Sequence, residues 1–227
     1  MSAASLPKPD SHGGGSRPTK GQSSRAAILF AAAKLATTKG LSGLSIGDLA
    51  AEVGMSKSGL YAHFKSKEDL ELAIVETAAV IFNTEVIEPA MDAHKGLVRL
   101  RALIDSFLSY LERRLFPGGC FFAAVALELD TRPGPARDRV VQVLDRWLAL
   151  LTECVVDAQA LGEIDEEVDV TQAVFEIEAM LLAANFLFVM TSDPAQLKQS
   201  RAGVENVLLR LVTNAAPKKK AAARSVS

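Results

Sequence analysis

Apolar residues recur along the chain with the spacing of an α-helix. The segment that begins at Ser24 is an example, because its apolar residues fall on one helix face: Ile28, Leu29, Ala32, Leu35 and Ala36. Alanine and leucine outnumber the β-branched residues, which favours helices over strands. The pattern therefore predicts an all-α fold of about nine helices.

Caps and breaks divide this pattern into elements. Ser45, Ser56, Ser66 and Asp169 stand where a side-chain oxygen can cap a helix N-terminus, and glycines and prolines separate the periodic segments. We expect the fourth helix to end at Pro89, which cannot continue a helix interior. The predicted helices cover residues 24–39, 46–53, 57–64, 65–87, 96–115, 119–130, 135–161, 170–191 and 194–215.

Composition and charge divide the chain into four parts. Residues 1–22 are rich in Ser, Gly and Pro and predict a flexible basic arm, and residues 217–227 predict a disordered basic tail. Between them we expect a small helical domain over residues 23–68 and a larger one over residues 69–216. Residues 1–67 hold nine Lys or Arg against three Asp or Glu, whereas residues 68–216 hold 12 against 24. A basic first third on an acidic body suggests that one end faces a polyanion.

The pattern argues against a membrane span and an export signal. The longest apolar stretch, Ala179 to Met190, is broken by Asn185 and falls short of the roughly 18 residues that suggest a span. It predicts a buried helix. The first residues lack the apolar core of an export signal, so we expect a cytoplasmic protein without a membrane partner.

Metal, cofactor and catalytic signals are also missing from the sequence. Cys120 and Cys154 have no metal-binding spacing and predict buried thiols, and the three histidines do not cluster with other ligands. We find no Gly-rich phosphate loop, nucleophile elbow or Cys/His pair. The prediction is therefore a protein that is not an enzyme and needs no metal or cofactor.

The clearest functional motif consists of two short helices, residues 46–53 and 57–64, joined at Gly54. They have the dimensions of a helix-turn-helix, with apolar residues that pack inward: Leu49, Ala50, Val53, Leu60 and Phe64. The outer face of the second helix then carries Lys57, Ser58, Gly59, Tyr61, Ala62 and His63. Since an α-helix fits the major groove of B-DNA, these residues predict binding to double-stranded DNA.

The run from Ile28 to Leu72 resembles the DNA-binding domain of the TetR family of bacterial transcriptional regulators. The likeness is strongest over GLSGLSIGDLAAEVGMSKSGLYAHFKSKEDL, from Gly40 to Leu70. The sequence departs from the commoner family pattern at Ala62 and at Ser58-Gly59, where Gly-Thr is usual. Those departures concern the operator sequence rather than the ability to bind DNA.

The resemblance implies a role for each residue of the motif. Ser45, Tyr61 and Lys67 would meet phosphates, whereas Lys57, Ser58 and His63 would lie in the groove. Gly59 would permit a close backbone approach, and Ala62 would touch a thymine methyl group. Structural roles are the alternatives: Ser45 as a helix cap only, Tyr61 as packing at the domain edge, and His63 as an exposed polar residue.

The resemblance also implies a ligand-binding and dimerisation domain over residues 69–216. Candidate residues for a homodimer interface are Leu182, Phe186, Val189, Val204, Leu208 and Leu211, with a single-chain core as the alternative. Candidate walls for an effector pocket are Phe107, Tyr110, Phe122, Trp147 and Phe175, which could equally be ordinary core.

Glu178 is a further candidate, because a carboxylate just before an apolar run is costly to bury without a partner. It could receive a cationic ligand or pair with an arginine across the dimer. The expected function is a ligand-responsive repressor, released from a palindromic operator by a small-molecule effector that the sequence does not identify.

Overall fold

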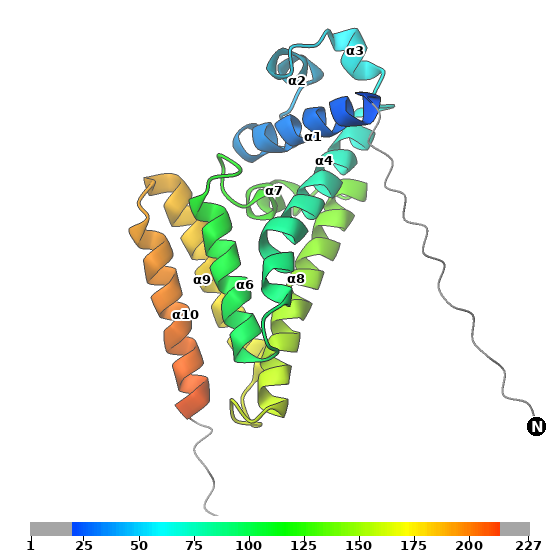
Figure 1. Cartoon of the computed structure of the whole chain (residues 1–227). Helices are drawn as coiled ribbons and strands as arrows, with labels where there is room; N and C mark the ends of the chain where they lie inside the picture. Colours follow the sequence, from blue (N-terminus) through cyan, green and yellow to red (C-terminus); the bar gives the residue numbers. More distant parts are fainter. Residues whose placement is uncertain (1–19, 214–227) are drawn as a thin grey trace, which may run out of the picture.

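The computed structural model describes residues 20–213, which form helices joined by short turns (Figure 1). Residues 1–19 of the predicted flexible arm and the whole predicted basic tail lie outside the described residues. Residues 20–22, predicted to belong to the arm, instead form the start of a helix. The all-α prediction is confirmed for the described chain. Its elements are α1 (Lys20–Lys39), α2 (Ile46–Glu52), α3 (Lys57–Tyr61), α4 (Lys67–Phe82), the π-helical turn η1 (Asn83–Ile87), α5 (Glu88–Met91), α6 (Leu97–Glu112), α7 (Phe121–Leu129), α8 (Pro135–Ala160), α9 (Val170–Thr191) and α10 (Ala195–Thr213).

The fourth predicted helix is longer than expected. α4, η1 and α5 follow one another without a break to Met91, so the described residues form nine continuous helical segments. The prediction that Pro89 ends this helix is wrong. Pro89 is the second residue of α5, in the first turn, where its missing N–H is tolerated. The preceding π-helical turn, η1, also shifts the hydrogen-bond pattern of the helix.

The predicted caps form in the structure. Ser45, Ser56, Ser66 and Asp169 each accept a hydrogen bond from the backbone N–H three residues later, over 3.0 to 3.1 Å. Gly54, in the turn between α2 and α3, has a φ of +66°, which L side chains rarely adopt. This turn sets the two short helices at an angle to one another.

The chain forms a small head and a larger body. The head consists of α1, α2 and α3 at one end of the molecule, and α4 runs from it into the body beside α8 (Figure 1). α6, α9 and α10 complete the body, and α7 lies at the junction, packed against α1 and α8. One continuous cluster of buried residues runs through head and body, so the two parts share a core.

α9 has two different faces. Ile177, Leu181 and Phe188 are buried in the body, whereas other large apolar side chains of the helix are exposed. Within the described residues, α9 alone is long and apolar enough to cross a membrane when judged by length and composition only. Its buried residues recur with helical spacing and contact α8 and α10, as in a core helix that has one face left uncovered.

Candidate DNA-binding surface and ligand cavity

The helix-turn-helix prediction agrees with the packing of the head. Leu49, Ala50, Leu60 and Phe64 are buried, and Val53 is half-buried against the same core. The second helix is shorter than predicted, however, because α3 ends at Tyr61. Since α3 is extended only by a turn through Phe64, His63 lies beyond the helix rather than on it.

The outer side of α3 is open to solvent. Lys57, Ser58 and Ala62 are exposed, and Tyr61 exposes 61% of its surface. Gly59 and His63 are half-buried. An exposed Tyr61 is not an edge-packing residue in this chain, so its ring and hydroxyl are available to a partner.

The three residues predicted to contact phosphates border one surface hollow. Ser45, Tyr61 and Lys67 line a depression of about 310 Å³ between α2, α3 and the start of α4. Lys57 lies nearby, because a Cβ added to Gly47 would come within 3.4 Å of Lys57 Nζ and 3.6 Å of Ser45 Oγ. Because Gly47 has no side chain, there is room for the Lys57 ammonium group at the N-terminus of α2. The same end of the helix favours a bound anion.

The Ser45 hydroxyl is engaged within the head. It donates to Asp48 Oδ2 over 2.6 Å, and Lys39 Nζ lies 2.9 Å from Asp48 Oδ1. The hydrogen bond from Ser45 and the charge of Lys39 lower the pKa of Asp48 to about 2. Asp48 therefore keeps a paired negative charge beside the hollow, and Ser45 acts as a helix cap whatever else it contacts.

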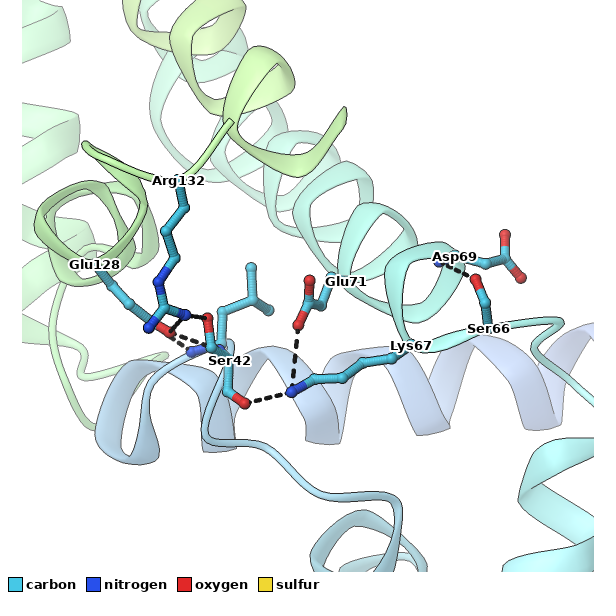
Figure 2. Close-up of polar contacts among 8 residues, drawn as sticks. Ser42, Ser66, Lys67, Asp69, Glu71, Glu128 and Arg132 are labelled. Atoms are coloured by element: carbon cyan, nitrogen blue, oxygen red, sulfur yellow. Dashed lines mark hydrogen bonds and ion pairs between the residues drawn. The ribbon is translucent and has the colours of Figure 1, made fainter. Parts of the chain in front are cut away.

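Lys67 is committed to contacts inside the chain. Its ammonium group donates to the backbone oxygen of Ser42 and lies 3.7 Å from Glu71 Oε1 (Figure 2). A phosphate contact by Lys67 would have to share or replace these interactions. Of the predicted phosphate contacts, Lys67 is thus the one that also joins α4 to the loop after α1.

A polar contact between head and body was not predicted from the sequence. The Glu128 carboxylate on α7 accepts hydrogen bonds from the backbone N–H groups of Leu41 and Ser42, each over 2.7 Å (Figure 2). Arg132 donates to the Ser42 hydroxyl and lies 3.9 Å from Glu128 Oε1. We call this set, Leu41, Ser42, Lys67, Glu128 and Arg132, the head-to-body contact.

Gly40 makes the head-to-body contact possible. It ends α1 with a φ of +79°, and an added Cβ would lie 2.9 Å from Glu128 Oε2. Burial alone would raise the pKa of Glu128, but the hydrogen bonds from Ser42 and Leu41 and the charge of Arg132 outweigh it and lower that pKa. Glu128 is therefore a carboxylate held in its charged form.

The body contains an apolar cavity of about 250 Å³. Four predicted pocket residues line it: Phe107, Phe122, Trp147 and Glu178. The other two do not. Tyr110 is buried in the aromatic cluster behind the wall, with its ring 6.1 Å from that of Phe82, and Phe175 points to solvent on α9 with 67% of its surface exposed. The prediction that Tyr110 and Phe175 line the pocket is therefore wrong. Their positions around the helix direct both side chains away from the cavity.

Phe82 is a cavity residue that sequence analysis missed. Its ring lies edge-on to those of Phe107, Phe122 and Trp147, at centroid distances of 5.4 to 6.4 Å. It comes from α4, the helix that leads out of the head, and its apolar character alone did not distinguish it from ordinary core. The signal that could have identified Phe82 is its spacing: it follows the buried Val75 by seven residues, which places both side chains on the same face of the helix.

α7 connects the cavity with the head. Phe122, Ala123 and Ala126 on this helix line the cavity, and Glu128 on the same helix holds the loop after α1. α7 therefore contributes both to the wall of the cavity and to the head-to-body contact.

The predicted dimer residues divide into two groups. Leu182 and Phe186 on α9 expose 46% and 62% of their surfaces, whereas Val189 and Leu211 are partly buried. Val204 and Leu208 are fully buried in the chain's own core, where α10 packs on α9, so they are not available to a second subunit. Those two predictions are wrong in this structure because the single-chain core takes that face of α10.

Other exposed residues continue the apolar surface of α9. We define the α9 face as Phe175, Leu182, Phe186, Leu187 and Met190, all of them exposed. Its spacing is that of one broad side of a helix. Phe175, expected in the pocket, and Leu187 and Met190, which sequence analysis did not single out, belong to this face.

Comparisons with known proteins agree with this architecture. Residues 28–74 match the family described as "Bacterial regulatory proteins, tetR family", and residues 96–204 match "Tetracyclin repressor-like, C-terminal domain". The structure is similar to a TetR transcriptional regulator from Chloroflexus aurantiacus J-10-FL, with 30% identity, a TM-score of 0.79 and coverage of 85% of this chain and 98% of that one.

Two further relatives carry more specific descriptions. AibR, solved in complex with isovaleryl coenzyme A and operator DNA, is 25% identical, with a TM-score of 0.65 over 83% of this chain and 98% of that one. The transcriptional repressor DhaR from Mycobacterium sp. (strain GP1) is 23% identical over 126 residues, which span 56% of this chain and 62% of the relative. Both domain matches and the likeness along the whole Chloroflexus protein lead to one conclusion: the chain belongs to the TetR family of DNA-binding transcriptional regulators.

Proposed function

We propose that the protein is a ligand-responsive repressor that binds a palindromic operator as a homodimer and releases it when a small molecule enters the cavity of the body. The observation that carries the proposal is the exposed outer side of α3 beside a hollow lined by Ser45, Tyr61 and Lys67. Residues 23–68 would form the DNA-binding domain and residues 69–216 the ligand-binding and dimerisation domain. A cytoplasmic location fits this role.

The geometry of the head supports major-groove binding. Lys57, Ser58 and Ala62 lie on the outer side of α3, where side chains can meet base edges, with Gly59 allowing a close approach. Tyr61 and Ser45 would contact phosphates, and these contacts would fix the register of the helix on the duplex. His63, beyond the end of α3, would contact the backbone at the edge of the groove rather than bases.

The α9 face supports a homodimer. Exposed Phe175, Phe186 and Met190 form an apolar surface that is costly to leave in water, and a second copy of the same face would cover it. A twofold axis there would present two copies of α3 to the duplex, so the preferred operator would be palindromic. DhaR, a repressor, supports repression as the outcome.

The position of α7 supports release by a ligand. A molecule that binds only a conformation with α7 displaced would weaken the contact of Glu128 with Leu41 and Ser42, and with it the orientation of the head. The ligand shifts the equilibrium by no more than its difference in affinity for the two conformations. AibR, solved with both a ligand and operator DNA, supports a combination of the two sites in one chain.

Selection from a random pool of DNA duplexes tests the proposal. The wild-type protein is expected to enrich a palindrome, and the double variant Lys57→Ala, Tyr61→Ala to enrich nothing. Lys198→Ala, which removes an exposed lysine of α10, is the matched control and should select the wild-type sequence. Failure of the wild-type protein to enrich any sequence at low salt would contradict the proposal.

A further inference from the structure

The cavity holds a single charge in apolar surroundings. Among the described residues that line it, Glu178 is the one charged side chain, and the others are apolar or aromatic apart from the thiol of Cys120. A carboxylate in such surroundings is unfavourable unless a partner compensates its charge. The partners of Glu178 therefore indicate what the cavity is built to hold.

Among residues 20–213, the partner of the Glu178 carboxylate is a hydrogen-bond donor and not a cation. Trp147 Nε1 donates to its Oε2 over 2.8 Å, and burial, which outweighs this hydrogen bond, raises the pKa of the carboxyl group. The α9 carboxylate that forms an ion pair with Arg210 of α10 is that of Glu176, two residues before Glu178. A carboxylate can accept about four hydrogen bonds, so Glu178 can accept further bonds from a molecule in the cavity.

The walls suit a cation as well. Phe107 and Trp147 lie nearly parallel, with ring centroids 6.0 Å apart and an interplanar angle of 27°. Phe82 and Phe122 complete an aromatic lining around the same space. Aromatic faces attract organic cations through their quadrupoles, and the attraction grows where water is excluded.

We propose that the effector is a small lipophilic amine, bound as its ammonium ion to the Glu178 carboxylate with its apolar part against the aromatic side chains that line the cavity. This inference rests on the proposed function and names the chemical class of its ligand. The volume of about 250 Å³ favours a compact molecule. An anion would place a second negative charge beside Glu178, and a hydrocarbon would leave the carboxylate unpaired.

Three matched probes test the class of ligand: phenethylamine, its neutral analogue propylbenzene and the anion hydrocinnamate. Trp147 is the only tryptophan of the chain and borders the cavity, so its fluorescence reports occupancy. Phenethylamine is expected to bind the full-length protein roughly tenfold to a hundredfold more tightly than the other two probes, the usual range for a charge-assisted hydrogen bond.

The variant Glu178→Gln tests the residue. It keeps the shape of the side chain and removes its charge, so the preference for phenethylamine over propylbenzene should disappear. Binding of propylbenzene should be unchanged, which also shows that the variant is folded. Glu153→Gln, at an exposed site on α8 outside the cavity, is the control and should behave as the wild type. Equal binding of the three probes, preference for the anion or no saturable binding of the amine would overturn the inference.

Two further measurements separate this inference from the proposed function. If Glu178 instead pairs with an arginine of a second subunit, Glu178→Gln weakens the dimer in sedimentation and the amine does not bind, which also overturns the inference. Duplex binding without probe tests the proposed function alone. A protein that binds its operator but keeps it at saturating phenethylamine would refute the amine effector and leave DNA binding intact.

Discussion

The proposed DNA-binding surface and the cavity are built from the chain in different ways. The residues of the surface, from Ser45 to Lys67, form one continuous stretch, and most of them point to solvent. The cavity takes its walls from α4, α6, α7, α8 and α9, between Phe82 and Leu182, and its lining is apolar apart from Glu178 and the thiol of Cys120. Residues of a surface that comes from one short stretch of the chain can be substituted one at a time. A substitution in a cavity formed by helices far apart in the sequence affects the packing of all of them. Substitutions in the two regions should therefore have separable effects.

Phe186→Asp should give the largest effect and tests whether the two regions are fully separable, because Phe186 lies in the body yet its substitution should strongly weaken operator binding. A carboxylate in the centre of the α9 face would prevent two apolar surfaces from associating. Loss of the second head should lower operator affinity by roughly a hundredfold or more, since linked binding sites gain at least that factor. Sedimentation and duplex titration measure the two consequences.

Val98→Asp is the control for Phe186→Asp. Val98 is an exposed apolar residue of α6 outside the α9 face, so this variant should remain dimeric and bind the operator normally. A dimeric Phe186→Asp protein would show that the subunits associate through another surface.

Lys57→Ala should have the next largest effect, and this effect should be confined to DNA binding. Loss of an ammonium group near the N-terminus of α2 is expected to reduce operator affinity about tenfold. If Lys57 contacts a phosphate, the slope of log affinity against log salt should fall by about one. An unchanged slope with altered sequence preference would instead assign Lys57 to a base. Ligand binding to the cavity should be unaffected in both cases.

Glu128→Ala should affect the link between the two regions. Removing the acceptor of two charge-assisted hydrogen bonds should lower the free energy of unfolding by about 1.5 to 3 kcal/mol. The same variant should weaken the response of duplex binding to a ligand, because α7 then no longer holds the loop after α1. Denaturant titration and ligand-dependent duplex binding check the two effects, with the exposed Glu112→Ala as control. A full ligand response in Glu128→Ala would show that the signal takes another route.

The pH dependence of this contact should be the smallest effect. The pKa of Glu128 is lowered in the folded protein, so its contribution to stability is present above the usual glutamate value of 4.5 and is lost as the pH falls through the folded value. The difference in unfolding free energy between wild type and Glu128→Ala should therefore shrink in acid. A difference that stays constant from neutral pH to below the folded pKa would mean that the charge of Glu128 does not stabilise the contact.

The sequence predicted the local structure well and the distant contacts poorly. Caps such as Ser56 and the inward residues of the helix-turn-helix depend on neighbours a few positions away, and they were found. The contact of Glu128 with Ser42 joins residues 86 positions apart, and no local spacing reveals it.

Helix phase explains the remaining errors. Phe175 and Phe107 are both aromatic residues of body helices, yet one faces solvent and the other the cavity, because the neighbouring helices decide which side is covered. Val204 and Leu208 were apolar as an interface requires, but the same property placed them in the chain's own core. Apolar periodicity identifies a helix face without identifying its partner.

Titration of the selected operator duplex across a salt series tests whether the head binds DNA through the outer side of α3. We expect tight binding at low salt and a steep, linear fall of log affinity with log salt, with a shallower slope for Lys57→Ala. Binding that ignores salt, or that is the same in wild type, Lys57→Ala and Tyr61→Ala, would contradict it.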